Sequence, residues 1–426
     1  MTTPRKRMTN WLRYVAAVAL VIGPWLLVSG QQLSPSSRVS LLTIGPGKPE
    51  DDLYTTFGHT AIRITDPAMG YDRTYDYGTF SYETGNFYVK FLRGTLPYII
   101  SSYNFYDVAS YYQRENRSLR EQVLNLSPTQ RQKLFNALET NLLPQNREYR
   151  YKFYYDNCST RPRDMLTAAM GDSLLWSPDT QRPTKSYRAW MNDYLAERPW
   201  SRLGMNLAIG KPADHVATGW ESMYLPNNVF DQLAKAQVRK PTGQIAPVVT
   251  QTLPLFVAPP LFGATPPLLL YPDFVMLALF GLVAFLTWRH WNAGGPRNSG
   301  AGHLGVWLDR LLFGFAGLWG WLLFLLWVAT DHGVTAWNPT LLWLLPLHLP
   351  GVFWATSPKR HPFQTGTYFR ITAVLLLISL FLTPAPGFAD ELFVGTLLIR
   401  ALFRSWIRTG QADVPRTSVR TSDVGE

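Results

Sequence analysis

The stretch YRYKFYYDNCSTRPRDML, residues 149–166, surrounds the only cysteine of the chain, Cys158. Its first half is aromatic and alternating, a pattern that predicts a β-strand. Its second half predicts a helix, because Asp156 or Asn157 can cap a helix start and Pro162 is tolerated in a first turn. A strand followed directly by a helix indicates an α+β fold, with Cys158 at or near a helix N-terminus.

This position favours a reactive thiol. Unpaired backbone N–H groups and the helix dipole stabilise a thiolate at a helix N-terminus, and the same amides can receive the oxyanion of a tetrahedral intermediate. The alternative is a small buried hydrophobe, as many lone cysteines are. The polar Asn-Cys-Ser-Thr setting favours a nucleophile, and Cys158 is therefore the candidate for covalent catalysis.

A thiol nucleophile needs a base, and the segment around Cys158 offers two histidines, His59 and His215. His59 lies in FGHTAIRI, residues 57–64, where the glycine permits close approach and the alternation predicts a strand with His59 and Ala61 on one face. His215 has no neighbour at nucleophile or ligand spacing, so we interpret it as a surface histidine. His59 is the predicted base.

A second strand is predicted at RTYDYGTF, residues 73–80. Asp76 on this strand can orient the imidazole of His59 and stabilise its charge, as the third member of a catalytic triad does. The alternative is that Asp76 is a solvated strand or turn residue, in which case Tyr77 is the neighbouring polar option. The sequence leaves this third position open.

The composition indicates a membrane protein with one large water-exposed segment. Hydrophobic residues make up 46% and charged residues 16% of the chain, and the long apolar stretches lie at the N-terminus and after about residue 255. The net charge of +11 can suggest nucleic acid, but many Lys and Arg flank apolar stretches and act as topology signals, so no nucleic-acid partner is predicted. One cysteine and scattered histidines predict no metal site and no cofactor.

The chain divides into five segments. Residues 1–30 combine a basic head with an apolar run and predict a signal sequence or N-terminal anchor. Residues 31–252 are globular in character, with a capping box at Ser127 that predicts a helix over 128–143. Residues 253–272 hold six prolines and predict a stiff connector. We expect a membrane domain of about five helices at 273–405 and a cytoplasmic tail at 406–426.

The candidate spans lie at residues 274–288, 311–329, 341–355, 371–383 and 392–403. Lys and Arg concentrate in the first and third connections and in the tail, which the positive-inside rule places in the cytoplasm. Residues 31–252 then face the periplasm of a multi-pass inner-membrane protein. The second connection faces the same side, and there His332 and Asn338 are candidates for binding a substrate, with an ordinary interfacial loop as the alternative.

The order His59, Asp76, Cys158 resembles the circularly permuted papain-like thiol enzymes. More closely, FGHTAIRI, YDYGTF, NFYVKFLRG, LNLSPTQ, YDNCSTRPRDML and the DHG to WNP stretch at 331–339 resemble the Lnb family, the lipoprotein N-acyltransferases of Bacteroidota. The resemblance implies a permuted papain-like domain followed by an all-α transmembrane bundle. It implies Cys158 and His59 as catalytic residues, with Asp76 as the third.

The resemblance also implies a reaction. An acyl chain would move from a membrane phospholipid, through a thioester on Cys158, to the N-terminal amine of a diacylglyceryl lipoprotein. One alternative is a papain-like cysteine hydrolase that acts on peptidoglycan or peptides, and another is a non-catalytic scaffold. Several membrane spans favour a reaction between two lipids, because a soluble substrate needs at most one anchor.

Overall fold

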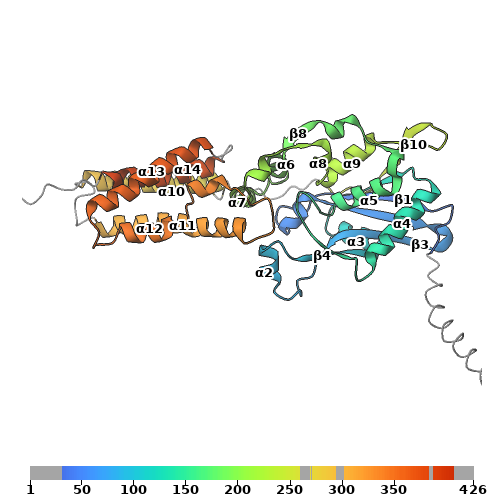
Figure 1. Cartoon of the computed structure of the whole chain (residues 1–426), viewed down its shortest axis with the longest axis horizontal. Helices are drawn as coiled ribbons and strands as arrows, with labels where there is room; N and C mark the ends of the chain where they lie inside the picture. The colour runs from blue at the N-terminus through green and yellow to red at the C-terminus, as the bar shows by residue number, and fades with distance from the viewer. Residues whose placement is uncertain (1–30, 260–268, 270, 294–301, 383–386, 407–426) are drawn as a thin grey trace, which may run out of the picture.

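The computed structural model describes residues 31–259, 269, 271–293, 302–382 and 387–406. These residues form an N-terminal domain with a central sheet and a separate bundle of helices, arranged end to end (Figure 1). The expected α+β class is confirmed. The expected signal sequence or anchor at 1–30, and the expected tail beyond residue 406, lie outside the described residues.

The N-terminal domain is built on a seven-stranded sheet in the order β12-β5-β1-β2-β3-β4-β6, in which every pair of neighbours is antiparallel. Its strands are β1 (Arg38–Ile44), β2 (His59–Asp66), β3 (Tyr71–Thr79), β4 (Pro97–Asn104), β5 (Leu119–Leu124), β6 (Glu148–Arg150) and β12 (Val249–Phe256). The strands predicted at His59 and at residues 73–80 are therefore confirmed as β2 and β3.

Helices surround the sheet and fill the connections. They are η1 (Leu53–Phe57), η2 (Pro67–Met69), α2 (Phe87–Leu92), α3 (Phe105–Arg114), α4 (Pro128–Leu142), α5 (Thr160–Met170), η3 (Gly171–Ser173), η4 (Pro178–Gln181), α6 (Tyr187–Tyr194), α7 (Pro199–Ala208), η5 (Lys211–Asp214), α8 (Gly219–Ser222) and α9 (Pro226–Lys235). Short strands lie between them: β7 (Leu174–Leu175), β8 (Pro183–Ser186), β9 (Val216–Thr218), β10 (Gln237–Arg239) and β11 (Ile245–Pro247).

The predicted helix start at Ser127 is confirmed. The Ser127 hydroxyl accepts the backbone N–H of Gln130 at 3.3 Å, and the Gln130 side chain accepts the N–H of Ser127 at 2.9 Å. The first turn of α4 thus satisfies its own orphan donors, which makes its start a local property of the sequence.

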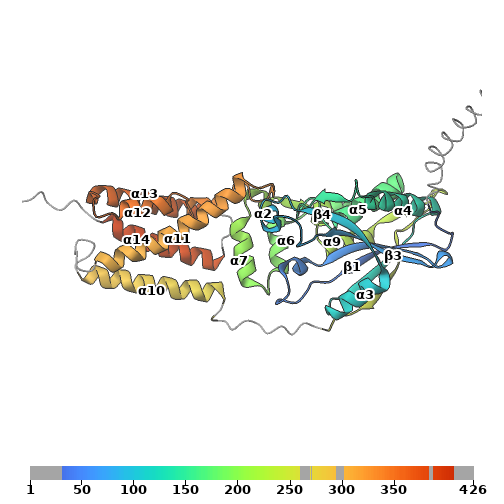
Figure 2. The same cartoon turned by 90° about the horizontal axis from the view of Figure 1, so that it is seen from below.

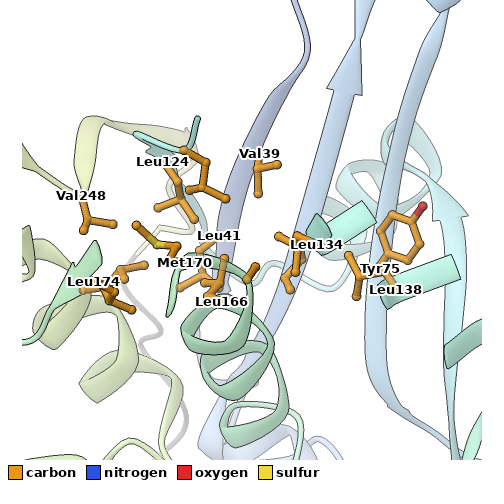
Figure 3. Close-up of a cluster of buried hydrophobic side chains, with 14 of the residues drawn as sticks. Val39, Leu41, Tyr75, Leu124, Leu134, Leu138, Leu166, Met170, Leu174 and Val248 are labelled. Carbon is orange, nitrogen blue, oxygen red and sulfur yellow. The ribbon is translucent and has the colours of Figure 1, made fainter. Parts of the chain in front are cut away.

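Both faces of the sheet are covered. On one face, Val39 and Leu41 of β1 pack with side chains of α4 and α5 (Figure 3). On the other face, Leu42 and Ile44 pack against α3. The two sets alternate along β1 because successive side chains of a strand point to opposite faces. The helix that follows Cys158 is therefore anchored on the main core through Leu166.

The sheet reaches further along the chain than we predicted. The globular segment was expected to end at residue 252, but β12 continues to Phe256 and pairs Pro254 with Arg120. A proline, which lacks an N–H donor, is tolerated here because β12 is the edge strand of the sheet. Of the expected proline-rich connector, residues 260–268 and 270 lie outside the described residues.

The bundle contains α10 (Pro272–Asn292), α11 (Gly302–Val328), η9 (Pro339–Leu342), α12 (His348–Ala355), α13 (Pro362–Leu382) and α14 (Phe388–Ser405). Within the described residues, α10, α11 and α13 are long and apolar enough to cross a membrane. α14 carries Asp390, Glu391, Arg400 and Arg404, so its composition is more polar.

The stretch predicted as a span at residues 341–355 is not one continuous helix. This stretch divides into η9 and the eight-residue α12. Pro346 between them lacks the N–H that a helix interior requires. At about 1.5 Å per residue, α12 alone is about 12 Å long. The stretch as a whole runs along α11, from Leu344 beside Gly320 to Thr356, which binds Arg310.

A buried ion cluster joins three helices of the bundle. The carboxylate of Asp309 in α11 forms salt bridges with the guanidinium groups of Arg400 and Arg404, both from α14, at 2.7 and 2.5 Å. Arg400 also donates to the hydroxyl of Thr287 on α10, at 3.1 Å. Asp309 and Arg400 are fully buried, so each charge depends on its partners.

The two parts of the molecule are in direct contact. Helix α7 packs across the ends of α10 and α11, as Figure 2 shows from below. The side chain of Asn338 donates to the carbonyl of Leu207 in α7 at 2.7 Å, and the N–H of Gly210 donates to Val334 at 2.7 Å. These bonds hold the N-terminal domain against one end of the bundle.

Candidate active site

The structure brings His59, Asp76 and Cys158 together from three elements. His59 opens β2, Asp76 lies on β3, and Cys158 stands just before α5. The His59 Nε2 and Asp76 Oδ1 atoms are 2.6 Å apart. The sheet register accounts for this contact: Asp76 pairs with Ala61, which is two residues along β2 from His59 and therefore on the same face.

Gly78 is the point at which the cysteine and the histidine meet. A Cβ atom on Gly78 would lie 3.4 Å from the Cβ of Cys158 and 3.7 Å from Cε1 of His59. The φ angle of Gly78 is +113°, a conformation that residues with side chains rarely adopt. A glycine in YDYGTF therefore leaves the space that these two side chains share. The sequence alone did not indicate this role.

Asn157 holds the chain around Cys158. Its side-chain oxygen accepts the N–H groups of Ser159 and Thr160 at 2.8 and 2.9 Å, and its amide nitrogen donates to the carbonyls of Phe153 and Tyr224. Of the two predicted caps, Asn157 therefore performs this role. We expected the amides at the start of the helix to bind the oxyanion. The N–H groups of Ser159 and Thr160 do not meet this expectation, because they already donate to Asn157.

The other predicted cap, Asp156, binds Arg161 instead. The carboxylate and the guanidinium form two hydrogen bonds, of 2.6 and 2.8 Å. Arg161 also lies over the ring of Tyr149 at 3.7 Å. The two parallel hydrogen bonds between Arg161 and Asp156 hold the exposed side of this loop, while Asn157 holds its buried side.

The electrostatics favour an ion pair between Cys158 and His59. Burial raises the pKa of the Cys158 thiol, but the charge and hydrogen bond of His59 outweigh burial and lower that pKa overall. Burial lowers the pKa of His59, but the Asp76 carboxylate and the Cys158 thiolate outweigh it and raise the pKa to about 10. Both shifts favour the thiolate–imidazolium form of the pair, which is the reactive form of a thiol nucleophile.

Two tyrosines complete the surroundings of the thiol. Tyr151 lies beside Cys158, and burial together with the thiolate charge raises the pKa of Tyr151. Its ring stacks on Tyr98 of β4 with centroids 4.5 Å apart. The aromatic run before Cys158 reads in the sequence only as a strand signal, because the contact between Tyr151 and Tyr98 depends on β4.

Comparison with known families gives two matches. A model of the Lnb N-terminal periplasmic domain matches residues 31–193, and a model of the Lnb transmembrane domain matches residues 265–411. The chain belongs to the Lnb family. The resemblance drawn from the sequence is thereby confirmed, and this Lnb-family chain is a membrane protein with a periplasmic domain, related to lipoprotein maturation. No curated protein and no solved structure matched it.

In this Lnb-family protein the other candidates for the catalytic site lie elsewhere. Tyr77 points into the core of the domain, where Asn141 donates to its hydroxyl at 2.7 Å. His215 lies 3.2 Å from the carboxylate of Glu221, and 55% of its side chain is exposed. Neither residue joins the group formed by His59 and its partners.

The two candidates of the second connection make contacts within the protein. His332 donates from Nε2 to the carbonyl of Leu92 at 3.0 Å. Asn338 is buried, donates to Leu207 and accepts the N–H of Thr340. Both residues therefore join the periplasmic domain to the bundle, and their role in substrate binding stays a prediction.

Proposed function

We propose that this protein is a lipoprotein N-acyltransferase. It would take an acyl chain from a membrane phospholipid, hold it as a thioester on Cys158, and pass it to the N-terminal amine of a diacylglyceryl lipoprotein. The observation that carries the proposal is the ion-paired Cys158 and His59, oriented by Asp76, in a periplasmic domain that rests on membrane helices. Inner-membrane localisation is part of this proposal.

In the first half-reaction the thiolate of Cys158 attacks the carbonyl carbon of a phospholipid ester. The helix N-terminus stabilises the developing oxyanion through its dipole, and the hydroxyl of Tyr151, which lies beside Cys158, is available as a donor. The C–O bond then breaks, and the His59 imidazolium donates its proton to the departing oxygen. The products are the Cys158 thioester and a lysophospholipid.

In the second half-reaction the lipoprotein amine attacks the thioester carbonyl. Neutral His59 takes a proton from the amine, an amide bond forms, and the thiolate of Cys158 leaves. Asp76 stabilises the imidazolium that is restored, because its carboxylate lies 2.6 Å from Nε2. The ion pair is then ready for the next phospholipid.

The test is mass spectrometry of the N-terminal peptide of a lipoprotein from cells that lack the protein and carry either the native chain or Cys158→Ala. We expect a triacylated peptide with the native chain and a diacylated peptide with Cys158→Ala. Met69→Ala, on the exposed turn η2, is the control and should restore triacylation. A triacylated peptide with Cys158→Ala would contradict the proposal, and cell-wall cleavage by the native protein would favour a hydrolase.

A further inference from the structure

The segment around α2 exposes several large apolar side chains. Between 52% and 77% of each of five such residues is exposed: Tyr82, Tyr88, Val89, Phe91 and Leu92. We name these five residues the α2 patch. A contiguous set of this kind on a soluble surface marks a binding site for another apolar surface.

Hydrogen bonds fix the α2 patch beside the end of a membrane helix. The N–H of Asp331 donates to the carbonyl of Arg93 at 2.8 Å, and His332 donates to Leu92 at 3.0 Å. Asp331 follows shortly after α11, a candidate span that ends at Val328. Figures 1 and 2 both place α2 next to this end of the bundle. The patch therefore lies level with this end of the candidate span α11.

Gly94 allows the α2 segment to pack closely against the loop that follows α11. Its φ angle is +65°, and a Cβ atom there would lie 3.0 Å from Nδ1 and 3.1 Å from the backbone nitrogen of His332. A side chain at Gly94 would push the α2 segment away from the loop after α11. The close packing at Gly94 thus fixes the position of the α2 patch relative to the end of α11.

Cationic residues lie within the same segment. Lys90 is in the last turn of α2, and Arg93 is the first residue after the end of that helix. An amphipathic segment with aromatic and cationic residues suits the zone in which acyl chains meet phosphate headgroups. The charges therefore favour a phospholipid surface as the occupant of the α2 patch.

A row of aromatic rings leads from the patch to the cysteine. The rings of Phe91 and Phe87 have centroids 6.1 Å apart, Phe87 is 6.1 Å from Phe80, and Phe80 is 5.4 Å from Tyr98. Tyr98 stacks on Tyr151, which lies beside Cys158. A chain of ring contacts thus continues from the α2 patch to Tyr151 beside the thiol.

We infer that the α2 patch inserts into the leaflet that faces the periplasmic domain and is the point at which the phospholipid acyl donor leaves that leaflet for Cys158. The delivery of the donor rests on the proposed function. The insertion of the patch rests on exposure and position, and it holds whether or not the thiol transfers an acyl chain. The two statements are therefore tested separately.

The first experiment measures insertion in the full chain. Because Cys158 is the only cysteine, Cys158→Ala gives a cysteine-free protein, to which Tyr88→Cys or Phe91→Cys adds one site for a nitroxide label. In vesicles of phosphatidylethanolamine and phosphatidylglycerol, we expect both labels to be more accessible to oxygen than to a water-soluble nickel complex. Met69→Cys, on a turn at the opposite end of β2 from His59, should show the reverse. If the labels at 88 and 91 showed the same oxygen and nickel accessibility as the label at 69, the inferred insertion would be wrong.

The second experiment measures delivery. With Cys158 intact, the Tyr88→Ser/Phe91→Ser variant should form the Cys158 thioester from vesicle phospholipid at least about tenfold more slowly, while iodoacetamide alkylates Cys158 at the native rate. Tyr106→Ser, an exposed tyrosine on α3, is the matched control and should form the thioester normally. Native thioester formation in the double variant would overturn delivery. Slowing only of the later amide step would also overturn it, and would assign the patch to the lipoprotein acceptor.

These outcomes separate the inference from the proposed function. If the native protein forms no thioester with phospholipid, the proposed function fails, while the nitroxide measurements on Cys158→Ala still decide insertion. If the thioester forms but the labels at 88 and 91 are in water, the proposed function stands and the insertion of the α2 patch is wrong.

Discussion

At the scale of single residues, the ion pair of Cys158 and His59 predicts how the thiol responds to pH. His59 lowers the pKa of Cys158, and the pKa of His59 is raised to about 10, so the pair exists from the lowered pKa of the thiol up to about pH 10. Alkylation by iodoacetamide, which follows the thiolate, should have its midpoint below about 8.5, the value of a free cysteine. In His59→Ala the cation is lost and burial remains, so the midpoint should rise above that value.

The measurement is the rate of carboxamidomethylation of Cys158, followed by mass spectrometry from pH 5 to pH 10. His215→Ala is the matched control, because His215 is exposed and binds Glu221 instead. An unchanged midpoint in His59→Ala would show that the two side chains are not coupled, and the proposed mechanism would then lose its base.

Asp76 acts through His59, and its replacement tests that role. Asp76→Asn removes the carboxylate 2.6 Å from Nε2, so the pKa of His59 should fall and the imidazolium should be lost at lower pH. We expect kcat for acyl transfer to fall by about 100-fold or more with little change in KM, and the alkaline limb of the pH profile to move to lower pH.

The control for Asp76 lies on the same strand. Asp72→Asn breaks a partly exposed ion pair with Arg63 and should leave the pH profile unchanged. If Asp76→Asn lowered only the thermal stability and left the alkaline limb in place, Asp76 would be a structural residue of β3 and not a partner of the base.

At the scale of elements, the start of α5 depends on Asn157. This residue is 2% exposed, and its side chain makes four hydrogen bonds. Asn157→Ala leaves buried N–H and C=O groups without partners, so we expect a loss of about 1–3 kcal/mol and slower alkylation of Cys158. Ser127→Ala removes the cap of α4 and should cost about 1 kcal/mol without affecting Cys158. Thermal unfolding and alkylation rates, measured together, distinguish the two effects. Equal alkylation in both variants would contradict a special role for Asn157.

The buried ion cluster is the corresponding feature of the bundle. Arg400→Met leaves the Asp309 carboxylate with Arg404 alone, and removing one partner of a buried pair costs about 3–5 kcal/mol. We expect a lower unfolding temperature of the detergent-solubilised protein. Lys359→Met changes an exposed cation and should leave this temperature unchanged. A stable Arg400→Met protein would mean that the cluster does not hold α11 and α14 together.

At the scale of the whole molecule, the arrangement predicts which surfaces face the periplasm. In the Cys158→Ala background, Met69→Cys should react with a membrane-impermeant maleimide added to spheroplasts, because it lies in the periplasmic domain. Lys359→Cys, between α12 and α13, should react only after the membrane is permeabilised. Labelling of both sites in intact spheroplasts would contradict the proposed multi-pass topology.

Local features of the sequence were sufficient for several predictions. The capping box at Ser127 and the helix start beside Cys158 were predictable, because caps and prolines act on the backbone within a few residues. The break within the third candidate span was not predicted, because apolar composition alone does not reveal it. The end of the sheet was misplaced because Pro254 is acceptable only on an edge strand, and a single sequence does not show which strand is the edge.

By itself, therefore, the sequence determined that this is an α+β domain joined to membrane helices, with Cys158 at a helix start and His59 on a strand. The tertiary structure decided that Asp76 is the partner of His59 and that Gly78 makes room for the side chains of Cys158 and His59. It also decided that the α2 patch stands beside the end of α11. The physical reason is that helix starts and strand alternation arise from neighbouring residues, whereas strand register and domain docking depend on contacts between distant parts of the chain.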